Sequence, residues 1–249
     1  MDTLVQTSGT EVRPRKSPRE CSIPVIRLYQ HNILVYQYNK SKTVPCGSYL
    51  RSTGIIVRKD TIMNIAEIYK ADTGNGPGMR VTLFVSGCRI HCKGCFNEKA
   101  QSFDYGKKWT KELEDYLINE LRKPYYKGLT ILGGEPFEPE NQPDILKLIL
   151  RVRKELPDRN IWIFSGNVYD INLVPGGSRY IEGITEQILD NIDVLVDGPF
   201  IESLYNITLN FRGSENQRII DMKETRKKGK VVLDPLNDFV PINERKLVQ

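Results

Sequence analysis

The sequence predicts an α/β fold built on a parallel sheet, because short apolar strands alternate with amphipathic helices from about residue 63 onward. Apolar runs predict buried strands over 80–87, 128–134, 160–166 and 193–200, and the first three runs end in glycine. Strands that alternate with helices are joined by right-handed crossovers and pair in parallel. We therefore expect βα repeats on a parallel sheet.

Three helices are expected between these strands. The segment 110–123 has leucines at helical spacing, with Thr110 as its N-cap. Pro143 opens the second helix, in a first turn where proline is tolerated. The third helix is expected over 180–192, where isoleucines recur in register. The stretch 207–222 is expected to be a turn between two extended pieces.

Length and composition predict a soluble protein that acts away from membranes. The chain has 249 residues, 39% hydrophobic and 27% charged, which suits one domain with appendages. No apolar run approaches the roughly 18 residues that indicate a membrane-spanning helix. The first residues lack the apolar core of a signal peptide, so we expect a cytoplasmic protein.

The basic excess of the chain lies at its two ends. Residues 1–62 hold 10 Lys and Arg against 4 Asp and Glu, and residues 222–249 hold 7 against 4. Residues 63–221 hold 19 against 23, so the middle of the chain is slightly acidic. A nucleic-acid-binding domain needs a basic stripe on its folded surface. We therefore expect no nucleic-acid partner.

Changes in composition and in the pattern of apolar residues divide the chain into three parts. Residues 1–62 are predicted to be an N-terminal extension, disordered over residues 1–20 and with short β-prone runs after that. Two interpretations stay open for it: upstream sequence before a true start at Met63, or a small extension packed on the main domain. Residues 63–222 are expected to form the functional domain, and residues 223–249 a basic C-terminal tail.

Unusual residues follow all four predicted strands. Three cysteines follow the first strand, and GGEP, residues 133–136, ends the second. Ser165 and Gly166 end the third strand, and Asp197 stands in DGPF at the end of the fourth. In parallel α/β sheets the chemistry gathers at the carboxyl ends of the strands. The functional site is therefore expected at this edge of the sheet.

The motif Cys88-Arg-Ile-His-Cys92-Lys-Gly-Cys95 brings three thiols within eight residues. Clustered thiols in a cytosolic chain indicate a metal or redox site rather than disulfides. Zinc needs four ligands, and His91 directly precedes Cys92, which makes joint tetrahedral ligation awkward. Three cysteines on a 4Fe–4S cluster leave one iron open for a small molecule. The spacing favours iron–sulfur and leaves zinc open.

A CxxxCxxC loop after the first strand and GGEP after the second resemble the radical S-adenosylmethionine superfamily. The resemblance runs from about Met63 to Met222 and is closest to the glycyl-radical-enzyme activases of that superfamily. The segments that carry it, in order, are NGPGMRVTLFVSGCRIHCKGCFN, LGGEPFEPENQPDILKLI, IWIFSG, VLVDGPF and FRGSENQR.

The resemblance implies the activity and the partners. In such activases three cysteines ligate a 4Fe–4S cluster, and S-adenosylmethionine chelates the fourth iron. An electron from a reduced flavodoxin-like donor splits S-adenosylmethionine into methionine and a 5′-deoxyadenosyl radical. That radical removes a hydrogen atom from a glycine of the partner enzyme, which the resemblance implies is an anaerobic ribonucleoside-triphosphate reductase.

The resemblance also assigns roles to individual residues. Glu135 is expected to pair with the methionine ammonium group, and Phe96 to pack on the adenine. Pro199 stands where some relatives carry a basic residue, and Arg212 is either a contact to substrate or cofactor or part of a surface salt bridge. The cluster ligands are matched by Cys88, Cys92 and Cys95, and the S-adenosylmethionine contacts by Gly94, Cys95, Phe96, Gly133, Gly134, Glu135, Ser165 and Asp197.

The length of the matching region bears on the fold. A complete eight-fold barrel takes about 250 residues, more than the region 63–222 provides. The resemblance therefore implies the radical S-adenosylmethionine fold as a partial, open TIM-like barrel of parallel strands, whose mouth admits the partner's glycine loop. Two alternative functions remain: an activase of another glycyl-radical enzyme such as pyruvate formate-lyase, and a zinc-stabilised binding module.

Overall fold

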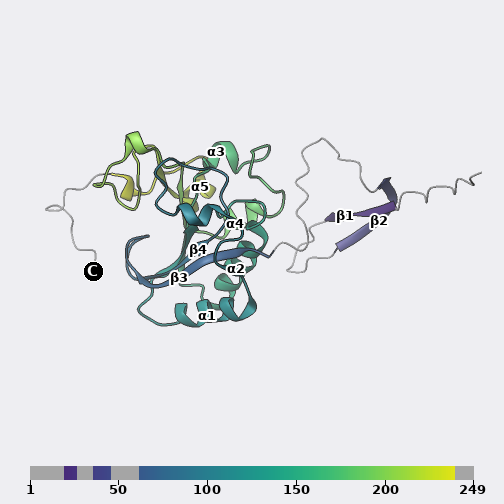
Figure 1. Ribbon diagram of the computed structural model, residues 1–249, viewed down its shortest axis with the longest axis horizontal. Helices are drawn as coiled ribbons and strands as arrows, with labels where there is room; N and C mark the ends of the chain where they lie inside the picture. The colour runs from purple at the N-terminus through teal and green to yellow at the C-terminus, as the bar shows by residue number, and fades with distance from the viewer. Residues whose placement is uncertain (1–19, 27–35, 46–61, 239–249) are drawn as a thin grey trace, which may run out of the picture. The chain divides into compact units, whose positions relative to one another are not determined.

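The computed structural model describes residues 20–26, 36–45 and 62–238 (Figure 1). The chain divides into two compact units, Met1–Gly54 and Ile55–Gln249. Within the described residues, no helix has the length and apolar character needed to cross a membrane.

The described part of the first unit is an antiparallel pair of strands. These are β1 (Glu20–Ile26) and β2 (Tyr36–Pro45). The pair agrees with the β-prone composition of this part of the sequence. The disorder predicted for residues 1–20 falls outside the described residues, except at Glu20.

Seven described strands of the second unit form one sheet. They are β3 (Asn64–Asp72), β4 (Arg80–Val85), β5 (Lys107–Lys108), β6 (Gly128–Gly133), β7 (Asn160–Phe164), β8 (Val194–Asp197) and β9 (Arg218–Asp221). Their order in the sheet is β5-β3-β4-β6-β7-β8-β9. The centre, β4-β6-β7-β8, is parallel, as βα repeats predict.

The sheet as a whole is mixed, which corrects the prediction of purely parallel strands. β3, β5 and β9 pair antiparallel with their neighbours, and in the described chain the sheet ends at β5 and β9 without closing. The outer strands are reached without a crossover helix: β3 turns into β4 through residues 73–79, and β9 follows β8 through the loop 198–217. Strands joined by such direct returns pair antiparallel.

The longer helices lie where the sequence predicts them. Thr110 caps the first helix, since its side chain accepts a hydrogen bond from Leu113 N at 3.4 Å. The helix predicted over 180–192 is shorter, because Gly183 has a φ of +75°, which an α-helix cannot contain. The helices are α1 (Lys111–Leu121), α2 (Gln142–Glu155), α3 (Tyr169–Asn172), α4 (Thr185–Asp190) and α5 (Met222–Lys228).

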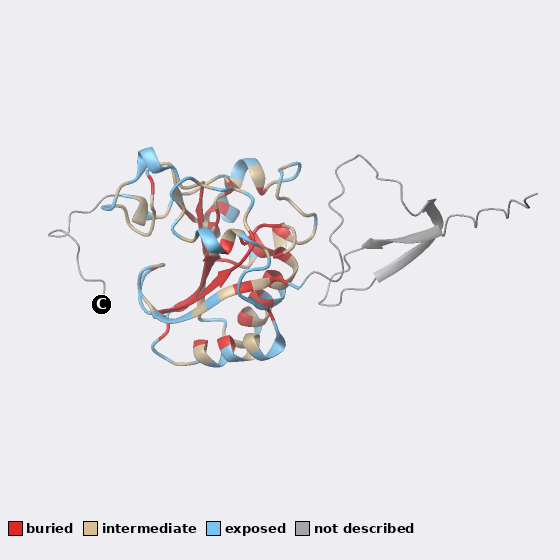
Figure 2. Cartoon of the chain, in the orientation of Figure 1, coloured by how far each residue is buried: buried red, intermediate tan, exposed pale blue. Residues whose placement is uncertain are grey.

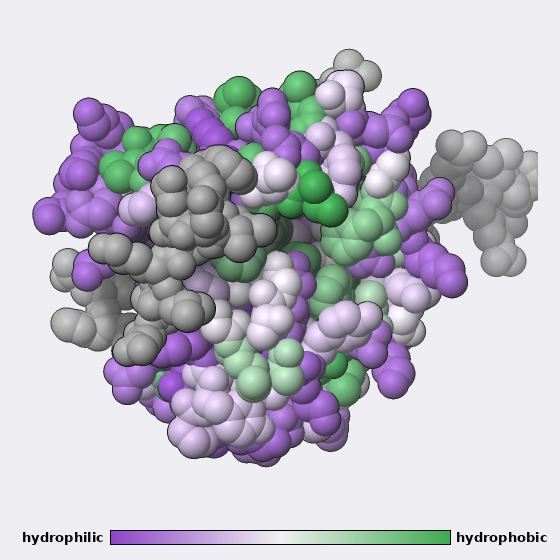
Figure 3. All heavy atoms as spheres, turned by 90° about the vertical axis from the view of Figure 1, so that its left-hand side faces the viewer, coloured by the Kyte–Doolittle hydropathy of each residue, from purple (hydrophilic) through white to green (hydrophobic). Residues whose placement is uncertain are grey.

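The buried core lies between the central strands and the helices, as Figure 2 shows. All six residues of β4 are buried. Ile145, Ile149 and Val152 of α2 and Leu117 and Leu121 of α1 are fully buried, at the spacing that predicted their inward faces. Some apolar side chains also reach the surface, and Figure 3 shows a group of them beside a hollow on one face.

Arg80 is a fully buried arginine at the amino end of β4. Its guanidinium donates to Thr130 Oγ1 at 2.6 Å, Asn160 Oδ1 at 2.7 Å and Leu129 O at 2.8 Å. These bonds join β4, β6 and β7 at the edge opposite the predicted site. Because protein acceptors satisfy the buried cation, Arg80 is a structural residue.

Part of the predicted basic tail packs against the sheet. Asp221 N donates to Val232 O and Asp234 N to Ile219 O, both at 2.9 Å. The segment after α5 thus returns along β9, and the described chain remains part of the fold as far as residue 238.

Candidate functional site

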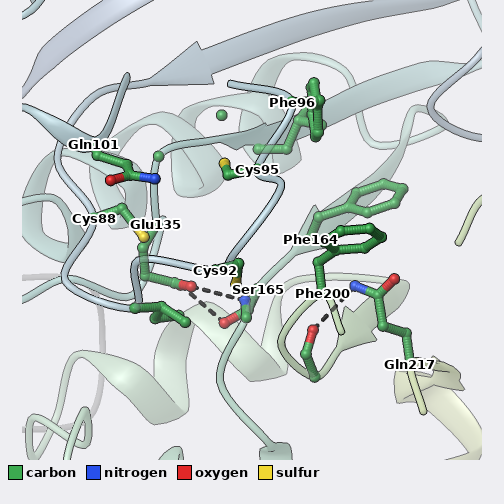
Figure 4. Close-up of a pocket in the computed structure, with 16 residues that line it drawn as sticks. Cys88, Cys92, Cys95, Phe96, Gln101, Glu135, Phe164, Ser165, Phe200 and Gln217 are labelled. Carbon is green, nitrogen blue, oxygen red and sulfur yellow. Dashed lines mark hydrogen bonds between the residues drawn. The ribbon is translucent and has the colours of Figure 1, made fainter. Parts of the chain in front are cut away.

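Residues that follow β4, β6, β7 and β8 meet around one cavity at the carboxyl edge of the sheet (Figure 4). This is the edge where the sequence predicts a functional site. The lining residues are Cys88, Ile90, Cys92, Cys95, Phe96, Gln101, Leu132, Gly133, Gly134, Glu135, Phe164, Ser165, Gly166, Gly198, Phe200 and Gln217.

The cysteine loop, residues 87–97, joins β4 to the short helix η1 (Glu98–Gln101). The N–H of Cys88 donates to a carbonyl of η1 at 3.0 Å, which holds the start of the loop. The N–H of Cys95 donates to Cys92 O at 3.2 Å, which closes a tight turn. All three thiols are free and half-buried, and they line the same cavity.

Burial makes the cysteine thiolates costly without a positive charge nearby. Burial raises the pKa of the Cys88 thiol to about 11, although the N–H groups of Ile90 and His91 hydrogen-bond the sulfur. Burial also raises the pKa of the Cys92 thiol, against a hydrogen bond from Phe200 N–H. A coordinating metal supplies the missing positive charge and ionises such thiols. The donor set therefore fits iron ligation.

His91 does not join the three thiols as a fourth ligand. The residue is exposed, has a φ of +52°, and places Nδ1 2.7 Å from Gln101 Oε1. In the described part of the chain, no three His, Cys, Asp or Glu side chains are grouped to hold one metal ion. Thiolates that bind three different irons do not need a common point. The arrangement favours a cluster with one iron free of protein ligands.

The glycine pair at the end of β6 packs against the start of the cysteine loop. Gly133 has a φ of +114°, and a Cβ on Gly134 would stand 2.6 Å from Gly87 O. Main-chain hydrogen bonds run from Gly134 N to Val85 O at 2.7 Å and from Glu135 N to Gly87 O at 2.8 Å. Only a glycine at 134 allows this approach, so it sets the distance between β6 and the loop.

Comparison with known proteins decides between iron–sulfur and zinc. Residues 74–220, which contain this arrangement, match a family described as a 4Fe-4S single cluster domain. The chain is 41% identical over 157 residues to the anaerobic ribonucleoside-triphosphate reductase-activating protein of Escherichia coli K12, a match that covers 62% of this chain and 96% of that protein. The chain belongs to the family of anaerobic ribonucleoside-triphosphate reductase-activating proteins.

Other members of this activating-protein family match over nearly the same share of the chain. The protein of that name from Vibrio cholerae is 41% identical over 159 residues, 63% of this chain and 97% of the relative. The one from Enterobacteria phage T4 is 35% identical over 158 residues, 63% of this chain and 93% of the relative. These matches span nearly the whole length of the relatives. Because the matched family is described as a 4Fe-4S cluster domain, the interpretation as a zinc-stabilised binding module is wrong.

In this member of the family, Glu135 is fully buried and joins the ends of β6 and β7. Its Oε1 accepts a hydrogen bond from Ser165 Oγ and its Oε2 one from Gly166 N, each at 2.8 Å (Figure 4). Oε1 also accepts from Phe137 N at 2.8 Å. The carboxylate also lines the cavity, where the sequence predicts a contact to an ammonium group. Burial raises the pKa of Glu135 to about 7 despite these three bonds.

We expect Glu135→Gln to remove a pH-dependent loss of stability from the metal-free protein. Since burial raises the pKa of the folded state from 4.5 to about 7, the stability that Glu135 contributes is present below pH 4.5 and lost as the pH rises through about 7. This difference in pKa between the folded and unfolded states corresponds to at most about 3 kcal/mol in the free energy of unfolding. Urea unfolding between about pH 4 and 8 measures it: the free energy of unfolding of the variant, relative to the native protein, should rise with pH. A constant difference would contradict the assignment.

Ser165 and Asp197 occupy different places in the site. Ser165 lines the cavity, and its Oγ donates to Glu135 Oε1 at 2.8 Å. The Asp197 carboxylate is buried and accepts from Tyr169 N at 2.8 Å and from Arg218 Nε at 2.9 Å. The next residue, rather than Asp197 itself, lines the cavity. Asp197 thus ties β8 to α3 and β9.

Phe96 and Gly94 stand at the rim, beside Cys95. Phe96 lines the cavity and its side chain is 82% exposed, so one face of the ring is free to meet a ligand. Gly94 has a φ of +72°, and a Cβ there would lie 3.4 Å from Glu202 Oε1. Glycine therefore suits the turn that carries the third cysteine.

Arg212 braces a loop instead of facing the cavity. Its guanidinium donates to Gln217 O at 3.1 Å and to Asn237 O at 2.7 Å. Within the described residues it pairs with no carboxylate and does not line the cavity, so the predicted contact to substrate or cofactor stays a prediction. Pro199 likewise acts through its main chain, since its carbonyl accepts from Asn216 Nδ2 at 2.7 Å.

Several residues that line the cavity were not predicted from the sequence as site residues, among them Gln101, Phe164, Phe200 and Gln217. Phe164 and Phe200 stand in the strand-end segments IWIFSG and DGPF, so the pattern already contained a signal for them. Gln217 holds the loop 198–217 through a hydrogen bond to Gly198 O at 3.0 Å. Gln101 had no signal, because only the folded structure shows that η1 returns to the cysteine loop.

Proposed function

We propose that this protein generates a glycyl radical on an anaerobic ribonucleoside-triphosphate reductase, using a 4Fe–4S cluster and S-adenosylmethionine. The observation that carries the proposal is the meeting of three free thiols and the glycine pair around one cavity. The printed name of the relatives supplies the target enzyme.

The cysteine loop would hold the cluster. Cys88, Cys92 and Cys95 would bind three irons and leave the fourth without a protein ligand. When bound, the cluster and S-adenosylmethionine supply the one-electron cleavage that produces the hydrogen-abstracting radical. The chain's own contribution is to direct main-chain N–H groups at the sulfurs of Cys88 and Cys92, which favours the thiolate form. Half-burial of the sulfurs opposes it, so the cluster would supply the remaining stabilisation.

The opposite side of the cavity would bind S-adenosylmethionine. Gly133 and Gly134 line the cavity, and their main chain would contact the methionine end. A carboxylate has about four acceptor sites, and Glu135 uses three of them on protein donors, so one remains for the ammonium group. Phe96 would pack on the adenine, and Asp197 would act indirectly, by fixing the strand end that lines the cavity. Gly94, Cys95 and Ser165 complete this set.

The open sheet would be the partial barrel of the radical S-adenosylmethionine fold. In the described chain its edges, β5 and β9, are not joined. A glycine within another protein would enter at the mouth of the cavity, at the carboxyl edge of this open sheet. The partner's glycine-bearing segment would then provide the missing wall and exclude water from the reaction.

The remaining proposals concern the setting of the reaction. Residues 63–222 would form the activase domain, which the family match over residues 74–220 supports. The N-terminal extension and the C-terminal tail lie beyond that match. A reduced flavodoxin-like protein would donate the electron, in the cytoplasm, where thiols stay reduced.

Anaerobic reconstitution with iron and sulfide tests the proposed function. We expect the reconstituted protein to form 5′-deoxyadenosine when reduced with S-adenosylmethionine, and to produce a glycyl-radical EPR signal on the co-expressed reductase. A radical on pyruvate formate-lyase instead of the reductase would show that the partner is wrong. Zinc at one equivalent, with no iron, would overturn the activity itself.

A further inference from the structure

A buried carboxylate outside the cavity binds the main chain of the cysteine loop. Glu138 has no solvent exposure. Its Oε1 accepts from Arg89 N at 2.8 Å and its Oε2 from Arg89 Nη1 at 2.5 Å. Arg179 Nη2 also donates to Oε1, at 3.3 Å. Since Arg89 N belongs to the peptide that follows Cys88, Glu138 holds the chain directly beside the first thiol.

The turn that carries Glu138 is itself fixed at both ends. Glu138 N donates to Glu135 O at 3.1 Å, and Glu138 O accepts from Asn141 N at 2.9 Å and Gln142 N at 3.1 Å. These bonds place the residue in the connection between β6 and the first turn of α2. The carboxylate is therefore a rigid acceptor, attached to the same strand end as the glycine pair.

The held peptide is the point from which the loop bends around its first sulfur. The main-chain N–H groups of the next two residues, Ile90 and His91, face the Cys88 sulfur closely enough to lower the pKa of its thiol against the effect of burial. A shift of the Cys88–Arg89 peptide would move the sulfur and these two donors together. Hydrogen bonds to the sulfurs and the placement of the ligands are what a protein uses to tune an iron–sulfur cluster.

We propose that Glu138 is a positioning residue, whose carboxylate holds the Cys88–Arg89 peptide and so keeps the Cys88 thiolate where the cluster needs it. The inference rests on the proposed cluster at the three cysteines. Glu138 does not line the cavity, so it acts only through the loop. Residues that orient metal ligands typically change metal affinity by about 10–100-fold when they are removed.

Glu140 provides a matched control within the same ion cluster. It binds the same guanidinium, with Arg89 Nη2 to Oε1 at 2.7 Å and Nη1 to Oε2 at 2.9 Å. Its side chain is 32% exposed and it makes no bond to the cysteine loop's main chain. The Arg89 guanidinium also stacks on Phe103, with its carbon 4.2 Å from the ring centre. If the two carboxylates acted only through the charge of Arg89, removing Glu140 would affect the cluster as much as removing Glu138.

A pair of double variants tests the bond from the N–H of residue 89 to the carboxylate. Arg89→Ala removes the guanidinium but keeps the N–H of residue 89, so the guanidinium of Arg89 is not left facing an altered partner. In Arg89→Ala/Glu138→Gln the amide oxygen can still accept that N–H. In Arg89→Ala/Glu138→Leu, with a side chain of similar size, it cannot. Glu138→Leu also removes the acceptor of Arg179 Nη2, so Arg179→Ala alone is the control for that second bond and should lose its cluster at the native rate.

The measurement is the rate at which an iron chelator removes the cluster from anaerobically reconstituted full-length protein, together with the EPR spectrum of the reduced cluster. We expect the Leu double variant to lose its cluster about 10-fold or more faster than the Gln double variant, and to show a changed spectrum. The Gln double variant and Glu140→Ala should stay within about 3-fold of the native rate.

Equal rates in the two double variants would overturn the positioning role. If the Leu variant does not fold, the rates of cluster loss are compared between Glu138→Asp and Glu140→Asp instead. Aspartate keeps the charge for the guanidinium but is one methylene too short to reach Arg89 N, so only Glu138→Asp should release the cluster faster; equal rates again overturn the role. A native chain that takes up no iron would overturn the proposed function and this inference with it.

Discussion

Cys92→Ala is expected to leave the reconstituted protein without a 4Fe–4S cluster. Cys92 is the middle thiol of the three that line the cavity, and the exposed His91 faces Gln101 instead of replacing it. Two thiolates can bind at most two of the four irons, which is too few to retain a cluster that already lacks a fourth protein ligand. Iron and sulfide should fall to below about a tenth of the native content, and 5′-deoxyadenosine formation should be lost.

Two control variants make the Cys92→Ala result specific. Cys21 and Cys46 lie upstream of the matching region and outside the motif, so alanine at both positions should leave the iron content unchanged. His91→Ala should also retain the cluster, because the ring is not a ligand. A full load of iron and sulfide in Cys92→Ala would contradict the ligand assignment.

The centre of the fold could be predicted because its signals are local. Apolar runs that end in glycine indicate β4, β6 and β7, and Thr110 caps α1 with its own side chain. Burial on both faces makes such strands apolar along their whole length. The positions of the four strand ends then follow from the rule for parallel crossovers, which is why the site's edge was found as well.

The edges of the sheet could not be predicted, because they depend on partners distant in the sequence. β9 has only four residues and pairs antiparallel with β8 across the loop 198–217. β3 has a single buried residue, Ile65, and its pairing with β4 is interrupted by two register shifts. Neither has the continuous apolar run of a central strand, so the repeat pattern favoured parallel pairing throughout.

The same limit applies to the site. The spacing of the cysteines is visible in the sequence, and so is the GGEP motif. By contrast, the bond from Glu138 to Arg89 joins residues 49 positions apart, and the approach of Gly134 to Gly87 exists only in the fold. Chemistry carried by neighbouring residues was predictable, whereas the contacts that position it were not.

Gly134→Ala is expected to reduce 5′-deoxyadenosine formation about 100-fold, because a displacement of about 1 Å in a reacting geometry has an effect of that size. The new Cβ would lie 2.6 Å from Gly87 O and 2.9 Å from Ala100 O. Both neighbours are main-chain atoms, so no side chain can rotate away. Either β6 or the start of the cysteine loop must move, and the bond from Glu135 N to Gly87 O must lengthen. Overpacking of this kind also costs about 1–3 kcal/mol of stability.

Gly74→Ala is the matched control for Gly134→Ala, since neither position has a left-handed φ and the change is the same. At Gly74 the added Cβ would meet only Asp72 Oδ1, at an ordinary contact distance of 3.5 Å. Thermal unfolding and the rate of 5′-deoxyadenosine formation should therefore match the native protein in this variant and fall together in Gly134→Ala. If Gly134→Ala kept the native rate, the close approach of β6 to the cysteine loop would not be what places the two halves of the site.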